Sequence, residues 1–241
     1  MMKKTIMATV TTMENIHMHC AAYLIALSAD PRVQIILTRG RPVDYARNQA
    51  VRVMLSHPEF THLFMIDSDM ELRDDSLDKL LALDAPIATG CYPALMGADL
   101  LWALGQKSAD GHYYLLEWFD DASVPFEVDC GGAGCLLIKR EVFEKTPWPW
   151  FSWQEDRNGK QISEDIYFFM QCNKFGYRAK VEPKVFCKHF KETDILPLMR
   201  ANNLYRMECA RKEGVTANYQ SYEATVIKQE AMKKANEDKT S

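Results

Sequence analysis

The chain has 241 residues, a formal net charge of −4 and a composition that is 47% hydrophobic and 26% charged. These values are typical of one large globular domain with a short appendage, and they exclude the disordered and collagen-like classes. The mild acidity argues against a nucleic-acid binder held by bulk charge, and no apolar run is long enough to predict a membrane span.

The seven cysteines are scattered and contain no Cys-x-x-Cys pair, so a zinc site built from cysteines is not expected. The apolar stretch near the start is interrupted by Thr9 and Glu14, which makes it too polar for a secretory signal. We therefore expect reduced thiols and a cytoplasmic protein.

The first half of the chain alternates apolar runs with segments of helical periodicity. Strands are predicted at residues 5–10, 33–37, 62–66 and 87–90, and helices at 16–29, at 43–57 and from Ser76 onward. This alternation predicts an α/β fold whose mostly parallel sheet has helices on both faces.

The second half opens with two strands, 100–106 and 112–119, around a turn at Asp110-Gly111, which predicts a small antiparallel excursion. Later elements are a strand at 135–138, a turn at Asn158-Gly159, a helix at 164–174 with Ser163 as its N-cap, and a strand at 179–186. Residues 1–214 are expected to form the domain, and 215–241 a charged helix or tail.

Asp67-Ser68-Asp69 directly follows the apolar run Leu63-Phe64-Met65-Ile66. Ligands of open α/β sheets bind beyond the carboxyl ends of the strands, and two carboxylates there can share a hard divalent cation that bridges phosphates. The alternative is a solvated acidic loop that caps the next helix.

An apolar strand that ends in Asp-x-Asp, after a helix carrying Ala46-Arg47-Asn48, resembles the GT-A fold of nucleotide-sugar glycosyltransferases. The likeness extends through residues 90–93 and 131–140, Pro149-Trp150-Phe151, Ser163-Glu164-Asp165 and His189. It covers roughly residues 5–190 and is similar to short, single-domain bacterial and viral members.

The resemblance implies a metal ion, Mn²⁺ or Mg²⁺, on the diphosphate of the donor. Asp69 would ligate it directly, Asp67 would face the ribose or the metal, and His189 would be a further ligand that favours Mn²⁺. The alternative for His189 is a surface histidine.

For the nucleotide, the resemblance implies that Thr9 and Thr11 contact base and ribose, together with Ser68. Arg47 would point toward the base or the diphosphate, or else make a surface salt bridge. Six basic residues lie between positions 174 and 191, and Lys191 is the first candidate for a phosphate clamp; a solvated basic face is the alternative.

The resemblance further implies that the carboxylate of Asp165, or else of Glu164, deprotonates the acceptor hydroxyl in an inverting transfer. The helix N-terminus lowers a carboxylate pKa, so such a base would gain more from position than from basicity. A plain capping pair is the alternative, and in a retaining enzyme these residues would orient the acceptor or the sugar.

Gly132 permits close approach of the backbone to a sugar, and Trp150 and Trp153 offer aromatic faces for an acceptor. Burial of some of these aromatic rings, Phe151 above all, is the alternative. His17, His19 and Cys20 are interpreted as structural residues.

The sequence thus predicts a metal-dependent glycosyltransferase that moves a sugar from a nucleoside diphosphate, most plausibly UDP, to a hydroxyl acceptor. The acceptor could be a glycan, a lipid-linked sugar or a hydroxymethylated base in viral DNA. The alternatives are a nucleotidyltransferase acting on sugar phosphates and a non-catalytic nucleotide-sugar or glycan-binding module. The charge divides into +3 over residues 1–66, −10 over 67–150 and +3 over 151–241, so a polyanionic partner is not excluded.

Overall fold

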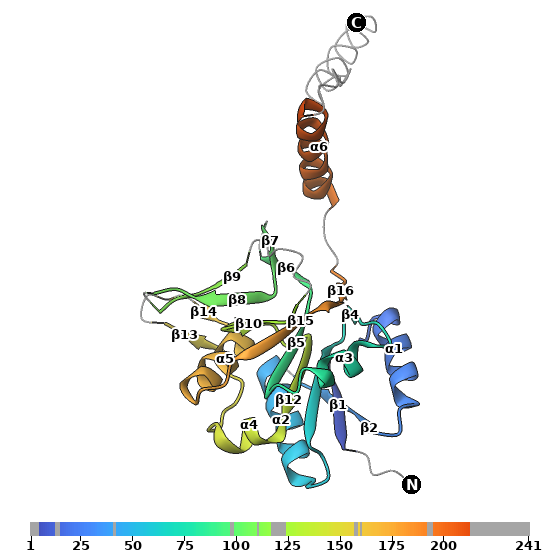
Figure 1. Cartoon of the computed structure of the whole chain (residues 1–241), viewed down its shortest axis with the longest axis vertical. Helices are drawn as coiled ribbons and strands as arrows, with labels where there is room; N and C mark the ends of the chain where they lie inside the picture. The colour runs from blue at the N-terminus through green and yellow to red at the C-terminus, as the bar shows by residue number, and fades with distance from the viewer. Residues whose placement is uncertain are drawn as a thin grey trace, which may run out of the picture. The chain divides into compact units, whose positions relative to one another are not determined.

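The computed structural model describes residues 5–12, 15–40, 42–96, 99–109, 111–116, 124–156, 159, 161–191 and 195–212 (Figure 1). The chain divides into two compact units, Met1–Lys191 and Glu192–Ser241. The second unit is described over α6 (Ile195–Lys212), and the predicted tail at 215–241 lies outside the described residues. Among the described helices, none is long and apolar enough to cross a membrane.

The first unit is built on a seven-stranded sheet with the order β10-β15-β5-β12-β3-β1-β2. Its strands are β1 (Ile6–Thr12), β2 (Val33–Arg39), β3 (His62–Asp67), β5 (Ile87–Cys91), β10 (Phe126–Val128), β12 (Cys135–Lys139) and β15 (Ala179–Phe186). Parallel pairing joins β2 to β1, β1 to β3, and β5 to β15; β12 runs antiparallel between β3 and β5, and β10 runs antiparallel to β15. All strands except β12 and β10 therefore point the same way, which confirms the expected mostly parallel sheet.

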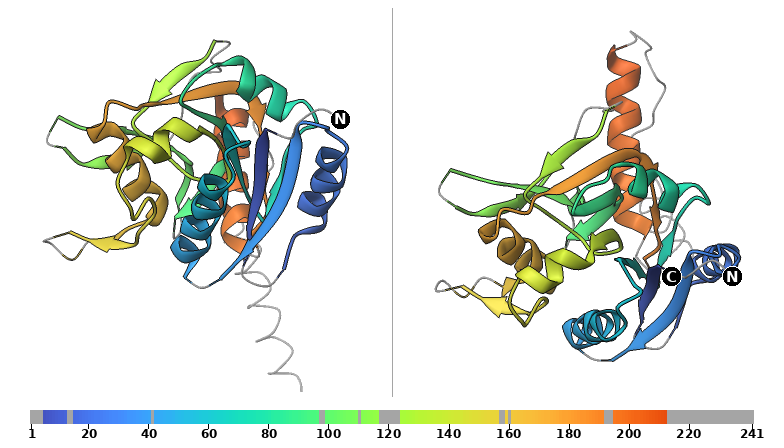
Figure 2. Two further views of the ribbon diagram at one scale, coloured as in Figure 1. Left: turned by 90° about the horizontal axis from the view of Figure 1, so that it is seen from below. Right: turned by 60° about the horizontal axis from the view of Figure 1, so that its bottom comes forward.

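Helices cover both faces of this sheet (Figure 2). On β3, Leu63 and Met65 face one hydrophobic core and Phe64 and Ile66 the other, as the two-residue period of a strand requires. The first core also contains side chains of α2 (Val43–Ser56), α4 (Arg140–Lys145) and α5 (Glu164–Lys174). The second contains side chains of α1 (Met18–Ser28) and α3 (Ser76–Ala82).

The antiparallel excursion is present, but the predicted strand at 100–106 is split at Ala103, whose N–H donates to Tyr92 O. One part, β7 (Asp99–Trp102), pairs with β6 (Pro93–Met96) in a hairpin. The other part, β8 (Leu104–Lys107), lies between β9 (Tyr113–Leu115) and β11 (Cys130–Gly131). Asp110 and residues 117–119 lie outside the described residues.

Two short ladders complete the first unit. β4 (Met70–Glu71) pairs with β16 (Lys188–His189), and β13 (Gln154–Glu155) pairs with β14 (Gln161–Ile162). The predicted turn residue Asn158 lies outside the described residues. The β4–β16 ladder brings the end of the unit next to the segment that follows β3.

Candidate active site

A cavity of about 460 Å³ lies where the carboxyl ends of β1 and β3 meet the start of α5. It gathers most of the residues singled out in the sequence. Those that line it are Thr11, Arg47, Asp67, Ser68, Asp69, Gly132, Trp153, Glu164, Asp165, His189 and Lys191. Thr9 and Trp150 are not among the lining residues.

Backbone hydrogen bonds hold Asp67-Ser68-Asp69 from two sides. Ser68 O accepts from His17 N–H at 2.8 Å, and Asp69 O accepts from Phe190 N–H at 2.9 Å. His17 comes directly before α1, and Phe190 comes directly after β16. The backbone of Ser68 and Asp69 is therefore held between the start of α1 and the end of β16.

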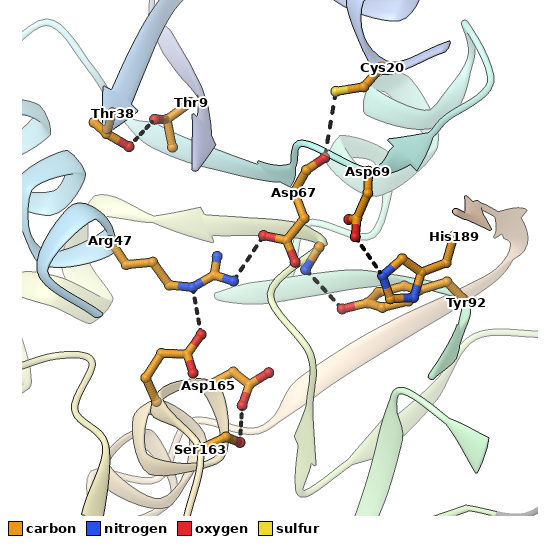
Figure 3. A network of polar contacts seen from close by, with 12 residues as sticks. Thr9, Cys20, Thr38, Arg47, Asp67, Asp69, Tyr92, Ser163, Asp165 and His189 are labelled. Carbon is orange, nitrogen blue, oxygen red and sulfur yellow. Dashed lines mark hydrogen bonds and ion pairs between the residues drawn. The ribbon is translucent and has the colours of Figure 1, made fainter. Parts of the chain in front are cut away.

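The side chains of His189 and Asp69 both line the cavity, and they face each other (Figure 3). His189 Nε2 lies 3.4 Å from Asp69 Oδ2, and His189 Nδ1 lies 2.8 Å from the carbonyl oxygen of Pro93. Because a carbonyl oxygen can only accept, Nδ1 carries a proton, and in the neutral ring Nε2 presents a lone pair to the carboxylate. Two acceptors at this separation need a proton or a metal cation between them.

The protonation of this pair is consistent with that requirement. Burial lowers the pKa of His189, but the hydrogen bond and charge of Asp69 raise it above its ordinary value. For Asp69 the effects have the opposite sign: burial raises its pKa, but hydrogen bonds from His189 and Lys191 lower it to about 2. Asp69 is thus an anion, and the deprotonated carboxylate is the form that binds a metal ion.

Arg47 is buried, with 3% of its surface exposed, and it joins three elements. From α2, its Nη2 donates to Asp67 Oδ1 at 2.9 Å, and its Nε donates to Glu164 Oε1, at the start of α5, at 3.0 Å (Figure 3). Its Nη1 is buried and has no hydrogen-bond partner among the described residues. Burial lowers the pKa of Arg47, but the neighbouring carboxylates more than reverse this, so the guanidinium stays charged.

Asp165 is held at the N-terminus of α5 by its own neighbours. Its Oδ1 accepts from the Ser163 hydroxyl and from Ile166 N–H. Ser163 occupies the predicted N-cap position, but its hydroxyl binds this carboxylate and caps no helix N–H. Burial raises the pKa of Asp165 and of Glu164, against the lowering effect of Arg47, so the decrease expected from the helix end does not prevail.

Gly132 and Gly134 are required by Tyr92, a buried residue that sequence reasoning gave no role. A Cβ atom on Gly132 would collide with the Tyr92 hydroxyl, and one on Gly134 would lie 3.0 Å from it. Tyr92 Oη accepts from Gly134 N–H at 2.8 Å. The glycines therefore let a tyrosine support the cavity wall, and Gly132 also lines the cavity.

The two threonines of β1 are two positions apart, so their side chains lie on the same side of the strand, and they differ in how far they are from its carboxyl end. Thr9 is fully buried and its hydroxyl bonds to Thr38 at 3.1 Å. Thr11 lines the cavity, and its buried hydroxyl has no partner among the described residues.

The aromatic loop also divides. Trp150 is buried, and its Nε1–H donates to the carbonyl oxygens of Phe143 and Thr146. Phe151 is fully buried, in agreement with the alternative considered for it. Trp153 lines the cavity with 46% of its surface exposed.

Asn48 is a further residue to which sequence reasoning assigned no role. Its side-chain amide donates to Asp44 O and Phe151 O, and its Oδ1 accepts from the N–H groups of Trp150 and Phe151. It thereby fixes the aromatic loop to α2, next to Arg47. The Arg-Asn pair in the sequence was the available signal.

Residues at and directly before the start of α1 contact the segments that carry the site. Cys20 Sγ donates to Asp67 O at 3.5 Å, and the rings of His17 and His19 stack on Phe190. All seven cysteines are free thiols, and Cys135 and Cys172 are buried core residues as expected. Within the described ranges, no group of three or more His, Cys, Asp or Glu side chains is gathered closely enough to hold a metal ion alone.

Comparisons with known proteins give a fold and no sequence family: no family model and no curated protein matches the chain. A197 from STIV is similar in structure, with a TM-score of 0.59 and 20% identity over 78% of this chain and 86% of that chain. GalNAc-T7, solved with UDP, GalNAc and Mn²⁺, has a TM-score of 0.51 and 10% identity over 79% of this chain. The match covers 44% of the GalNAc-T7 chain, so this chain spans less than half of its length.

The inositol-1-phosphate CTP transferase from T. maritima is a more distant likeness, with a TM-score of 0.45 and 12% identity over 89% of this chain and 99% of that chain. At these identities the similarity concerns the fold alone. The α/β architecture expected from the sequence, a GT-A fold, is confirmed.

Proposed function

We propose that this protein is a metal-dependent glycosyltransferase that moves a sugar from a nucleoside-diphosphate donor, most plausibly a UDP-sugar, to a hydroxyl acceptor. The observation that carries the proposal is that the side chains of Asp69 and His189 face each other in one cavity with the buried carboxylate of Asp165. The GT-A fold is consistent with this chemistry, and the UDP and Mn²⁺ in the GalNAc-T7 structure recommend them as the first ligands to test.

Asp69 and His189 would hold the Mn²⁺ or Mg²⁺ ion through their facing oxygen and nitrogen atoms. Neighbouring ligands of an octahedral ion are about 3 Å apart when each bond is about 2.1 Å, close to the 3.4 Å separation found. The Nδ1–H bond from His189 to Pro93 O fixes the tautomer that a metal-binding histidine needs. Diphosphate oxygens and water would complete the coordination, with Asp67 near the metal or the ribose.

The charge of the cavity gives a separate reason for a cation. Its lining carries four carboxylates, Asp67, Asp69, Glu164 and Asp165, against two cationic side chains, Arg47 and Lys191. The formal balance is −2 without His189, so a diphosphate would meet a repulsive wall. A bound divalent ion would cancel that charge and stabilise the leaving diphosphate as a Lewis acid.

The remaining residues have roles that follow from their positions. Asp165 would accept the proton of the acceptor hydroxyl, and its raised pKa suits a general base. Thr11 and Ser68 would contact the nucleotide, Lys191 would move from Asp69 to a phosphate oxygen, and the exposed ring of Trp153 would stack on the acceptor. Arg47 would act by holding Asp67 and Glu164 in place.

The test is release of free nucleoside diphosphate when the purified protein is incubated with Mn²⁺ and a panel of UDP-, GDP- and other nucleotide-sugars. We expect metal-dependent release from one donor, faster with a hydroxyl acceptor. Asp69→Ala should abolish it, and Asp74→Ala, an exposed aspartate outside this cavity, should not. No binding or hydrolysis of any donor would refute the proposal, and release of pyrophosphate from nucleoside triphosphates alone would indicate a nucleotidyltransferase.

A further inference from the structure

The β6–β7 hairpin carries apolar side chains on one outward face. Leu95 and Leu100 are opposite each other in the ladder and are 36% and 58% exposed. Trp102, two positions along the hairpin from Leu100, is half-buried and packs against the first hydrophobic core, and the centre of its ring lies 5.8 Å from that of the exposed Phe186. We call Leu95, Leu100, Trp102 and Phe186 the apolar strip. Single exposed apolar residues are ordinary on a protein surface, but a contiguous set marks an interaction site.

Lysines flank the apolar strip. At the end of β15 and the start of β16, Lys184, Phe186 and Lys188 point outward, whereas Val185 and Cys187 between them are buried. Lys188 pairs with Glu71, and Lys184 makes no ion pair within the described part of the chain. The exposed row is therefore a lysine, an aromatic residue and a lysine, and its aromatic residue contacts the hairpin through Trp102.

We propose that the apolar strip and its lysines dock on an anionic lipid bilayer. Leucine and phenylalanine side chains gain free energy by entering the acyl boundary, and tryptophan favours the interfacial depth. Lysines beside them are attracted to anionic headgroups and keep their charged ends in water. A bilayer satisfies both halves of this pattern along one surface.

The opposite face of the hairpin belongs to the candidate active site. Ala94, between Pro93 and Leu95, lines the cavity, and Pro93 O accepts from His189. A bilayer on the apolar strip would thus lie against the same hairpin that contacts His189 on its other side. If the chain is the glycosyltransferase proposed above, on which this consequence rests, the acceptor hydroxyl belongs to a lipid-linked substrate.

Sedimentation with vesicles tests the docking surface. The protein should sediment with vesicles of phosphatidylcholine and phosphatidylglycerol more than with phosphatidylcholine alone, and added salt should weaken the binding. Leu95→Ser with Leu100→Ser should reduce the partition by about tenfold or more. Lys184→Glu should reduce it by about fivefold or more.

The matched control is Ile25→Ser with Leu37→Ser, which removes two exposed apolar side chains on α1 and β2 and should sediment as the parent does. Failure of the parent protein to sediment with either vesicle would overturn the inference, as would equal losses in the control and the strip variant. Light scattering that shows a dimer lost in the strip variant, with sedimentation unchanged, would assign the strip to a second copy of the chain.

Donor turnover measured on the same samples separates the two proposals. Turnover without vesicle binding refutes the docking surface alone, and vesicle binding without turnover refutes the proposed function alone.

Discussion

At the scale of single residues, the charge of one guanidinium acts on three carboxylates. Asp67, Glu164 and Asp165 all raise the pKa of Arg47, which in turn opposes the burial that raises the pKa of Glu164 and Asp165. Removing one member of a buried ion pair leaves its partner charged and desolvated, whereas an exposed pair contributes little. Among the ion pairs of the site, those of Arg47 should therefore contribute most to the free energy of unfolding.

Arg47→Ala should lower the free energy of unfolding by about 3–5 kcal/mol, because two carboxylates lose their buried partner. Urea unfolding followed by circular dichroism measures the change. Arg52→Ala removes an exposed arginine from the same helix and should change stability by less than about 0.5 kcal/mol. Equal effects of the two substitutions would show that the buried network contributes nothing special.

Asp165→Asn should separate donor binding from transfer. Under the proposed function, transfer falls by about 10²–10⁴-fold because no base remains, while nucleotide affinity is retained. In the parent protein, transfer should decline as pH falls through the raised pKa of Asp165, because the protonated carboxyl cannot accept a proton. An acidic limb that survives in Asp165→Asn would assign the titration to another group.

The same substitution has a stability signature of defined sign. The pKa of Asp165 is higher in the folded than in the unfolded chain, so ionisation above the unfolded value destabilises the fold. Asp165→Asn should therefore unfold at a higher temperature than the parent near neutral pH. The difference should vanish at pH values below the unfolded pKa. Scanning calorimetry at the two pH values checks it.

At the scale of elements, the aromatic loop at Trp150-Phe151 is attached to helix α2 by the side chain of one residue. Asn48 uses both amide hydrogens and its oxygen to fix the aromatic loop to α2. Asn48→Ala leaves buried backbone groups of Trp150 and Phe151 unpaired and should cost about 2–4 kcal/mol. Urea unfolding provides the measurement, with Ser56→Ala, an exposed hydroxyl at the end of α2, as the neutral control. Similar values for both would show that the loop is held by packing alone.

Long periodic elements were predictable and short ones were not. The runs at 62–66, 164–174 and 179–186 match β3, α5 and β15 within a residue, because burial imposes their periods. The two-residue strands β4 and β16 are too short to show a period, and the six-residue α4 was also missed. The run at 100–106 looks continuous as a sequence, yet its two halves pair with different strands, β7 with β6 and β8 with β9 and β11.

The chemical types of the site residues were predictable from the sequence, but which of these residues reach the cavity was not. Thr9 and Thr11 have the same chemistry and lie on the same side of β1, but Thr9 bonds to Thr38 within the sheet and only Thr11, nearer the end of the strand, meets the cavity. Trp150 and Trp153 belong to the same loop, yet Trp150 is buried with its backbone N–H bonded to Asn48 and Trp153 lines the cavity. Arg47 was expected near a ligand, and its pairing with Glu164, which is 117 positions away, leaves no signal in one sequence.

At the scale of the whole molecule, a donor that binds only the folded state must stabilise it. At concentrations of about 100 times the dissociation constant, Mn²⁺ with UDP should add about 2.7 kcal/mol, a melting-temperature rise of roughly 5–10 °C. Thermal unfolding with metal, nucleotide, both or neither measures this. Asp69→Ala should remove the rise and Asp74→Ala should keep it; a rise that persists in Asp69→Ala would move the metal away from Asp69.

The β4–β16 ladder also sets an order in time. A chain leaving the ribosome has completed the seven strands of its sheet at Phe186, but the partner of Asp69 is His189. Asp69 and His189 therefore come together only after the last strand of the sheet has been synthesised. Under the proposed function, a chain that ends after Phe186 contains all seven strands of the sheet but lacks His189 and Lys191. Such a chain should consume no nucleotide-sugar, because both partners of Asp69 are missing.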